Sequence, residues 1–166
     1  MRRVVFGLLA SAGLVAVLIA ARFIMAAPSN ESVAQRFNQK RAIYEQLGDM
    51  LVEDKSLRQL AWWGVRTATD PIGQAPPVNE LTSDRYQKYK ALLSDIEASG
   101  MTRSEGDDPN ICILVWASGW AADTVHVLAC QSGHDAPQPD ARLSVFSLGD
   151  RWDVHRDDIQ PAGRSS

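Results

Sequence analysis

The sequence predicts an α+β fold with an N-terminal transmembrane helix, followed by two main helices packed on an antiparallel sheet of about four strands. Three observations carry this prediction: an uncharged apolar run at the N-terminus, helical periodicity in the middle of the chain, and short apolar runs in the last third. They divide the 166 residues into a membrane anchor or signal segment (1–27), one exported domain (28–160) and a disordered tail (161–166).

The apolar run over residues 4–21 contains no charged side chain and follows Arg2 and Arg3. As a helix it is about 27 Å long, close to the roughly 30 Å hydrocarbon core of a bilayer. The positive-inside rule keeps the basic N-terminus in the cytoplasm and sends the chain after Pro28 across the membrane. We therefore expect a single-pass bacterial inner-membrane protein that contacts the lipid bilayer through residues 4–27 and has a periplasmic C-terminal domain.

The alternative is a signal peptide that is cleaved to release the domain into the periplasm. A signal peptidase requires small residues before its cleavage site, but Met25 and Ile19 occupy the positions that matter ahead of Pro28 and Arg22. These residues favour an uncleaved anchor. Because no cysteine lies near the end of the segment, a lipid-modified cysteine anchor is excluded.

Two helices are expected from apolar periodicity. Between Asn30 and Val52, apolar residues recur at spacings of three, four and seven with charged residues between them, and Ser29 or Asn30 is the expected N-cap. The second helix begins after Thr82 or Ser83 and ends by Gly100. Between these helices we expect a short helix over residues 56–63 and then an irregular connection over residues 65–81. After the second helix, residues 101–110 are expected to form an acidic loop.

The last third has the pattern of paired strands. We expect strands over residues 111–117, 124–130, 142–148 and 151–155. The second pair turns at Gly149 and Asp150, and alternation places Leu143 and Val145 on the face of Trp152 and Val154.

The two cysteines give the sharpest structural expectation. A first hairpin symmetric about Ala121 places Cys112 opposite Cys130, Leu114 opposite Leu128, and Trp116 opposite His126. Directly opposed residues in an antiparallel pair lie within disulfide range. In an exported chain this favours a structural disulfide between Cys112 and Cys130, with two buried thiols or a metal or redox role as alternatives.

No catalytic residue, metal site or cofactor site is assigned from the sequence. Ser118, Asp123 and His126 are weak hydrolase candidates because they crowd one hairpin end, where a triad draws on separate elements. His126 and His134 could join the cysteines around zinc, but close-spaced ligand pairs are missing. Glu105, Asp107 and Asp108 lack the spacing of a calcium loop.

Charge and aromatic content bound the partners. Three of the 17 basic residues precede residue 28, so the remaining chain has 14 basic and 20 acidic side chains and a formal charge of −6. This argues against nucleic-acid binding. Trp62, Trp63 and Trp120 are candidate anchors for an envelope protein partner; the alternative is that they cap the core.

The segment RYQKYKALLSDIEASG, followed by ICILVWASG, resembles small uncharacterised bacterial exported or lipoprotein-like proteins with a RYxxYxxLL helix before an apolar strand. The resemblance covers roughly residues 31–156. It implies a helix-then-sheet order and a bacterial origin, and no activity. This chain departs from such proteins in lacking their lipidated cysteine.

The function expected from the sequence is a non-enzymatic, membrane-anchored periplasmic binding or accessory protein of the bacterial envelope, including an immunity-type protein. The alternative is an envelope hydrolase whose site is too scattered to recognise. An exposed apolar patch favours the first, and a cleft with convergent titratable groups favours the second.

Overall fold

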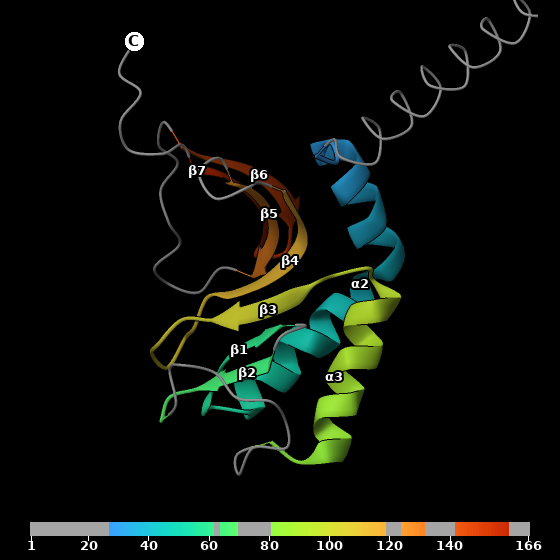
Figure 1. Cartoon of the computed structure of the whole chain (residues 1–166). Helices are drawn as coiled ribbons and strands as arrows, with labels where there is room; N and C mark the ends of the chain where they lie inside the picture. The colour runs from blue at the N-terminus through green and yellow to red at the C-terminus, as the bar shows by residue number, and fades with distance from the viewer. Residues whose placement is uncertain (1–26, 62–63, 70–80, 119–123, 132–141, 160–166) are drawn as a thin grey trace, which may run out of the picture.

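A computed structural model describes residues 27–61, 64–69, 81–118, 124–131 and 142–159 (Figure 1). The described helices are α2 (Asn30–Glu53) and α3 (Ser83–Asp95). The strands are β1 (Leu57–Ala61), β2 (Gly64–Thr67), β3 (Gly100–Arg103), β4 (Ile111–Ser118), β5 (Thr124–Gln131), β6 (Leu143–Gly149) and β7 (Trp152–Ile159). They form one antiparallel sheet in the order β2-β1-β3-β4-β5-β7-β6.

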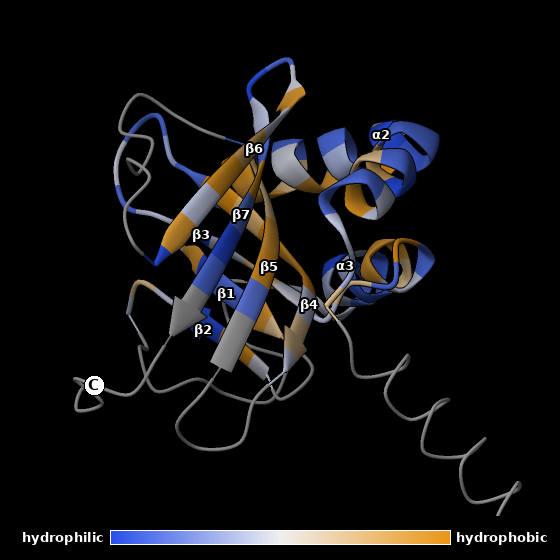
Figure 2. Cartoon of the chain, turned by 90° about the horizontal axis from the view of Figure 1, so that it is seen from above, coloured by the Kyte–Doolittle hydropathy of each residue, from blue (hydrophilic) through white to orange (hydrophobic). Residues whose placement is uncertain are grey.

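The predicted fold class is wrong in its sheet, which has seven strands among the described residues instead of about four. Two helices do lie on one side of the sheet, as the view from above shows (Figure 2). The sheet is strongly curved at the β4, β5, β7 and β6 end (Figure 1). The molecule is therefore richer in strand than the sequence pattern indicated.

The prediction of a single-pass inner-membrane protein is also corrected. Across the ranges that the structure describes, no helix is both long and apolar enough to cross a membrane. Both described helices are amphipathic, with charged residues on their outer faces. The predicted bilayer contact over residues 4–27 lies, except for its last residue, outside the described residues, as does the predicted tail over residues 161–166.

The short helix expected over residues 56–63 is wrong because its chain forms strand β1 up to Ala61. Leu57 and Leu60 are both buried, and their spacing of three resembles a helix turn. A bulge between Leu57 and Gln59 produces this spacing in a strand, because the extra residue returns the second leucine to the same face. Two further predictions are wrong at their first residues. Strand β2 lies where the irregular connection was expected to begin, and strand β3 lies where the acidic loop was expected to begin.

The helix starts are fixed by local hydrogen bonds. Ser29 is the N-cap of α2, where its hydroxyl accepts from the Ser32 amide at 3.2 Å, and Thr82 caps α3 by accepting from the Arg85 amide at 3.3 Å. Helix α2 departs from helical geometry at Lys40. The helix contacts β4, β6 and β7 as well as α3, so it lies over the half of the sheet that runs from β4 to β6.

The centre of the core is an aromatic cluster between α2 and β7. Phe37 lies 5.0 Å from Tyr44 and 5.4 Å from Trp152 between ring centroids, and Tyr44 meets Trp152 edge-on at 5.9 Å. All three rings are fully buried. Such tilted ring pairs add attraction beyond the area they bury, so this cluster fixes how α2 sits on the sheet.

The second hairpin has a register different from the predicted one. Val145 faces His155 and Phe146 faces Val154, so Val145 lies on the face opposite that of Val154. Trp152 pairs with Gly149 after a register shift that begins at Ser147. This bulge next to the turn, which alternation alone does not reveal, shifts the predicted face by one residue.

Candidate functional site

The sequence-predicted disulfide is confirmed. Cys112 on β4 faces Cys130 on β5, their Cα atoms are 4.1 Å apart, and their sulfur atoms are bonded. Leu114 faces Leu128 two pairs further along, as expected. The crosslink joins the two central long strands across 18 positions of sequence.

The rest of that hairpin differs from the symmetric prediction. A bulge between Leu114 and Trp116 places Trp116 opposite Val127, and Ala117 opposite His126. Ser118, the next residue, therefore lies on the other face of the sheet from His126. The two described members of the weak hydrolase set are thus not brought together as nucleophile and base, and Asp123 lies outside the described residues.

A histidine that sequence analysis passed over lies against the disulfide. His155 on β7 is only 4% exposed, and one of its ring nitrogens lies within 4.8 Å of both cysteine sulfurs. Across the strands it faces Leu128 and Val145. Burial lowers the pKa of the His155 imidazole, and the nearby carboxylate of Asp153 opposes this shift.

The histidines named from the sequence are placed differently. His126 shares the face of Cys130, but His155 takes the place beside the cysteines, and His134 lies outside the described residues. The signal that could have found His155 is the pairing of β5 with β7, which puts His155 diagonally across from Cys130. Alternation within one hairpin does not contain that information.

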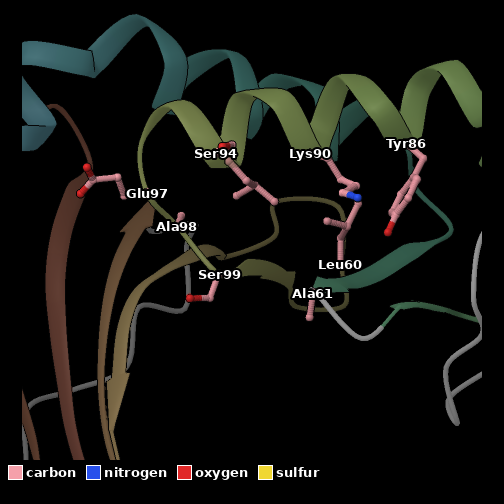
Figure 3. Close-up of a pocket in the computed structure, with 9 residues that line it drawn as sticks. Leu60, Ala61, Tyr86, Lys90, Ser94, Glu97, Ala98 and Ser99 are labelled. Atoms are coloured by element: carbon pink, nitrogen blue, oxygen red, sulfur yellow. The ribbon is translucent and has the colours of Figure 1, made fainter. Parts of the chain in front are cut away.

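A groove of about 400 Å³ separates α3 from β1 and the chain before β3 (Figure 3). Its walls are formed by Leu60, Ala61, Tyr86, Lys90, Leu93, Ser94, Glu97, Ala98 and Ser99. The Lys90 ammonium lies 5.6 Å from the centre of the Tyr86 ring, and Glu97 pairs with Arg36 at 3.4 Å. The groove therefore combines apolar walls with two charges that are already engaged, and its lining holds no histidine or cysteine.

A polar cluster joins the two described helices. Asp54 Oδ2 accepts from the Tyr89 hydroxyl at 2.7 Å and from Arg85 Nε at 2.9 Å. Arg85 Nη2 also donates to the Met50 carbonyl and to Glu53. Burial, followed by Asp54, raises the pKa of the Tyr89 hydroxyl well above its usual range. Because these groups satisfy one another at the C-terminal end of α2, they fix the position of α3.

The two outer edges of the sheet differ. Strand β2 is four residues long and includes the exposed charge of Arg66. Strand β6 has seven residues, Leu143–Gly149, without a charge or a proline. On this strand Phe146 is 39% exposed, one of only two exposed large hydrophobic side chains among the described residues. Charges and short length protect a sheet edge from pairing, and β6 has neither protection.

The partner-binding residues named from the sequence cannot be placed, because Trp62, Trp63 and Trp120 all lie outside the described residues. Their role stays a prediction. The chain matches no protein-family model, no curated protein and no solved structure. The resemblance to exported and lipoprotein-like proteins therefore also stays a prediction.

Proposed function

We propose that this protein is a non-enzymatic protein-binding module that pairs an extended segment of its partner with the outer edge of β6. The observation that carries the proposal is the uncharged edge of β6 with its exposed Phe146. Edge pairing supplies main-chain hydrogen bonds for affinity, and alternate side chains supply specificity. The envelope setting expected from the sequence is not part of this proposal.

The backbone of β6 supports this mode of binding. Antiparallel pairing with β7 uses the N–H and C=O groups of every second residue and directs those of the others away from β7. Within the described part of the chain, no second strand pairs with β6, which is the last strand of the sheet. A row of backbone donors and acceptors beside an exposed phenylalanine accepts another extended chain.

The composition of β6 indicates the chemistry of the partner. The strand has no charged residue over Leu143–Gly149, and Phe146 on it is exposed. An uncharged extended segment with an apolar side chain fits this edge, because it brings no unpaired charge to the contact. A second copy of β6 meets this description.

The test uses the full chain and a blocked peptide of residues 142–150 as the probe. We expect the peptide to bind and to slow hydrogen exchange at the outward amides of β6. A Phe146→Lys substitution places a charge on the edge and should weaken binding at least about tenfold. Val52→Lys is the matched control, because Val52 is the other exposed large hydrophobic residue, 43% exposed on α2.

Two results would overturn the proposal. One is that the peptide does not bind and that the full chain, sedimented at up to near-millimolar concentration, does not self-associate. The other is equal binding by Phe146→Lys, Val52→Lys and the wild type, or equal binding of a scrambled peptide, since either would show that the contact does not depend on the β6 edge.

A further inference from the structure

We infer that the Cys112–Cys130 disulfide and His155 form a zinc site when the disulfide is reduced. The two sulfurs and one imidazole nitrogen lie within 4.8 Å of one another. In a tetrahedral zinc site, ligand atoms at about 2.0 to 2.3 Å from the metal are separated by roughly 3.5 to 3.8 Å. Small side-chain rotations are enough to bring the three groups to that spacing once the sulfurs are no longer bonded.

Three different strands hold the three ligands in place. Cys112 is on β4, Cys130 is on β5 and His155 is on β7, and these strands are adjacent in the sheet. The ladder of backbone hydrogen bonds fixes their relative positions before any metal binds. A rigid set of ligands on regular elements loses little conformational entropy on binding, which favours a defined site over incidental coordination.

The surroundings suit a neutral metal complex. Cys130 and His155 are buried, and Cys112 is half-buried. Leu128 on β5 and Val145 on β6, which face His155, are apolar, and the half-buried Asp153 faces Cys130. Two thiolates balance the charge of Zn²⁺, and a neutral imidazole adds none. The complex therefore has no net charge, which limits the cost of placing it in an apolar setting. The half-buried side at Cys112 leaves a water as the fourth ligand, a coordination that zinc accepts.

Reduction of the disulfide supplies the two sulfur ligands. A dithiol reductant gives two electrons and two protons to the disulfide and is itself oxidised to a disulfide, which leaves thiols on Cys112 and Cys130. Zn²⁺ then binds both sulfurs and the imidazole, and the two thiol protons are released to solvent. Oxidation removes two of the three ligands, so the same residues hold either a crosslink or a metal ion.

Zinc titration of the full chain in its two redox states tests the inference. Protein is reduced with a dithiol, separated from it without oxygen, and titrated with Zn²⁺ against a chromophoric chelator. We expect one Zn²⁺ per reduced chain and none per oxidised chain. Co²⁺ in place of Zn²⁺ should show thiolate-to-metal absorption and the visible bands of a tetrahedral site in the reduced protein alone.

Substitutions separate this site from incidental binding. In the reduced chain, His155→Ala should weaken Zn²⁺ binding by at least about 100-fold, the upper end of the loss caused by removing even an outer-shell partner. His126→Ala is the matched control on the same face and should bind like the wild type. Far-UV circular dichroism of oxidised His155→Ala, where the disulfide still holds the sheet, checks that the variant folds.

Three outcomes would overturn the inference. The reduced wild type could bind no Zn²⁺, or His155→Ala could bind it as tightly as the wild type. The third is a reduced chain that has the spectrum of a coil both with and without Zn²⁺, since the metal would then be bound by an unfolded chain.

Discussion

The two halves of the sheet solve the same packing problem in different ways. The short-strand half consists of β2, β1 and β3, with four or five residues each, and the long-strand half consists of β4, β5, β7 and β6, with seven or eight. Aromatic packing and a disulfide hold the long-strand half. In the short-strand half, a side chain on β3 bonds to the turn between α2 and β1, where Arg103 Nη1 donates to the Lys55 carbonyl at 2.6 Å.

The two halves also differ in the edge strand at which each of them ends. The long-strand half has the disulfide and the aromatic cluster, and it ends in the uncharged edge of β6. The short-strand half ends in β2, which is short and charged. The edge that we propose as the binding surface thus belongs to the half that has the disulfide and the aromatic cluster, which is the arrangement a preorganised binding edge needs.

The largest expected effect tests the aromatic cluster of the long-strand half. Trp152→Ala removes a fully buried indole that touches Phe37 and Tyr44, and should lower the free energy of unfolding by about 3 to 5 kcal/mol. Urea denaturation followed by circular dichroism measures this loss. Trp116→Ala is the control, because Trp116 is only partly buried; an equal loss in both variants would show that the cluster is not the centre of the core.

Removing the disulfide is expected to have the next largest effect. The bridge spans 18 positions, so Cys112→Ser combined with Cys130→Ser should lower the free energy of unfolding by about 3 kcal/mol, the cost of leaving that loop open in the unfolded chain. Urea denaturation of the oxidised wild type and of the double variant measures the difference. The double variant should also be insensitive to reductant, whereas a wild type whose stability does not change on reduction would contradict the prediction.

The same contrast explains what the sequence could and could not predict. Both described helices and the four strands of the long-strand half lie close to the ranges expected from periodicity, and Cys112 was correctly placed opposite Cys130. Seven or eight residues are enough for alternation to show. The four or five residues of β1, β2 and β3 are not, and the bulge after Leu57 gives β1 the spacing of a helix.

The candidate sites were less predictable than the fold because they depend on pairing between distant strands. His155 reaches the cysteines only through the register of β5 with β7. The exposed edge of β6 follows from its being last in the strand order, which no local pattern states. The predicted face of Val145 and the predicted partner of Trp116 are both wrong. Each lies in a hairpin with a bulge, where one extra residue moves a side chain to the other face.

Two glycines lie close to neighbouring elements, Gly100 of β3 beside β1 and Gly48 of α2 beside β5 and β7. A Cβ on Gly100 would lie 2.6 Å from the Leu60 carbonyl oxygen, so Gly100→Ala should separate β3 from β1 and cost about 1 to 3 kcal/mol. A Cβ on Gly48 would lie 2.9 Å from the end of the Gln131 side chain, which can move, and 3.7 Å from Trp152, an ordinary van der Waals contact. Gly48→Ala should therefore stabilise α2 by up to about 1 kcal/mol. Thermal unfolding measures the change in stability of each variant. Changes of the same sign in Gly100→Ala and Gly48→Ala would contradict the prediction.

The two buried tyrosines give a smaller and opposite pair of effects. The Tyr89 hydroxyl donates to Asp54, so Tyr89→Phe should cost about 1.5 kcal/mol, the low end for a bond to a charged group because Asp54 keeps its bond to Arg85. The Tyr44 hydroxyl is buried without a hydrogen-bond partner among the described residues. Tyr44→Phe should leave stability unchanged or raise it by up to about 1 kcal/mol. Urea denaturation at neutral pH measures both, and a clear loss in Tyr44→Phe would reveal a partner for its hydroxyl.

The smallest expected effect is the dependence of stability on alkaline pH. Burial raises the pKa of Tyr44 to about 12, above its ordinary value of 10.0. Between these two values the unfolded chain releases the phenolic proton and the folded chain keeps it, so unfolding becomes more favourable as pH rises. The contribution of Tyr44 is thus fully present below pH 10 and is lost as pH rises toward 12. Stability measured from pH 9 to 11 should fall less steeply in Tyr44→Phe than in the wild type, and parallel curves would show that this hydroxyl is accessible to water.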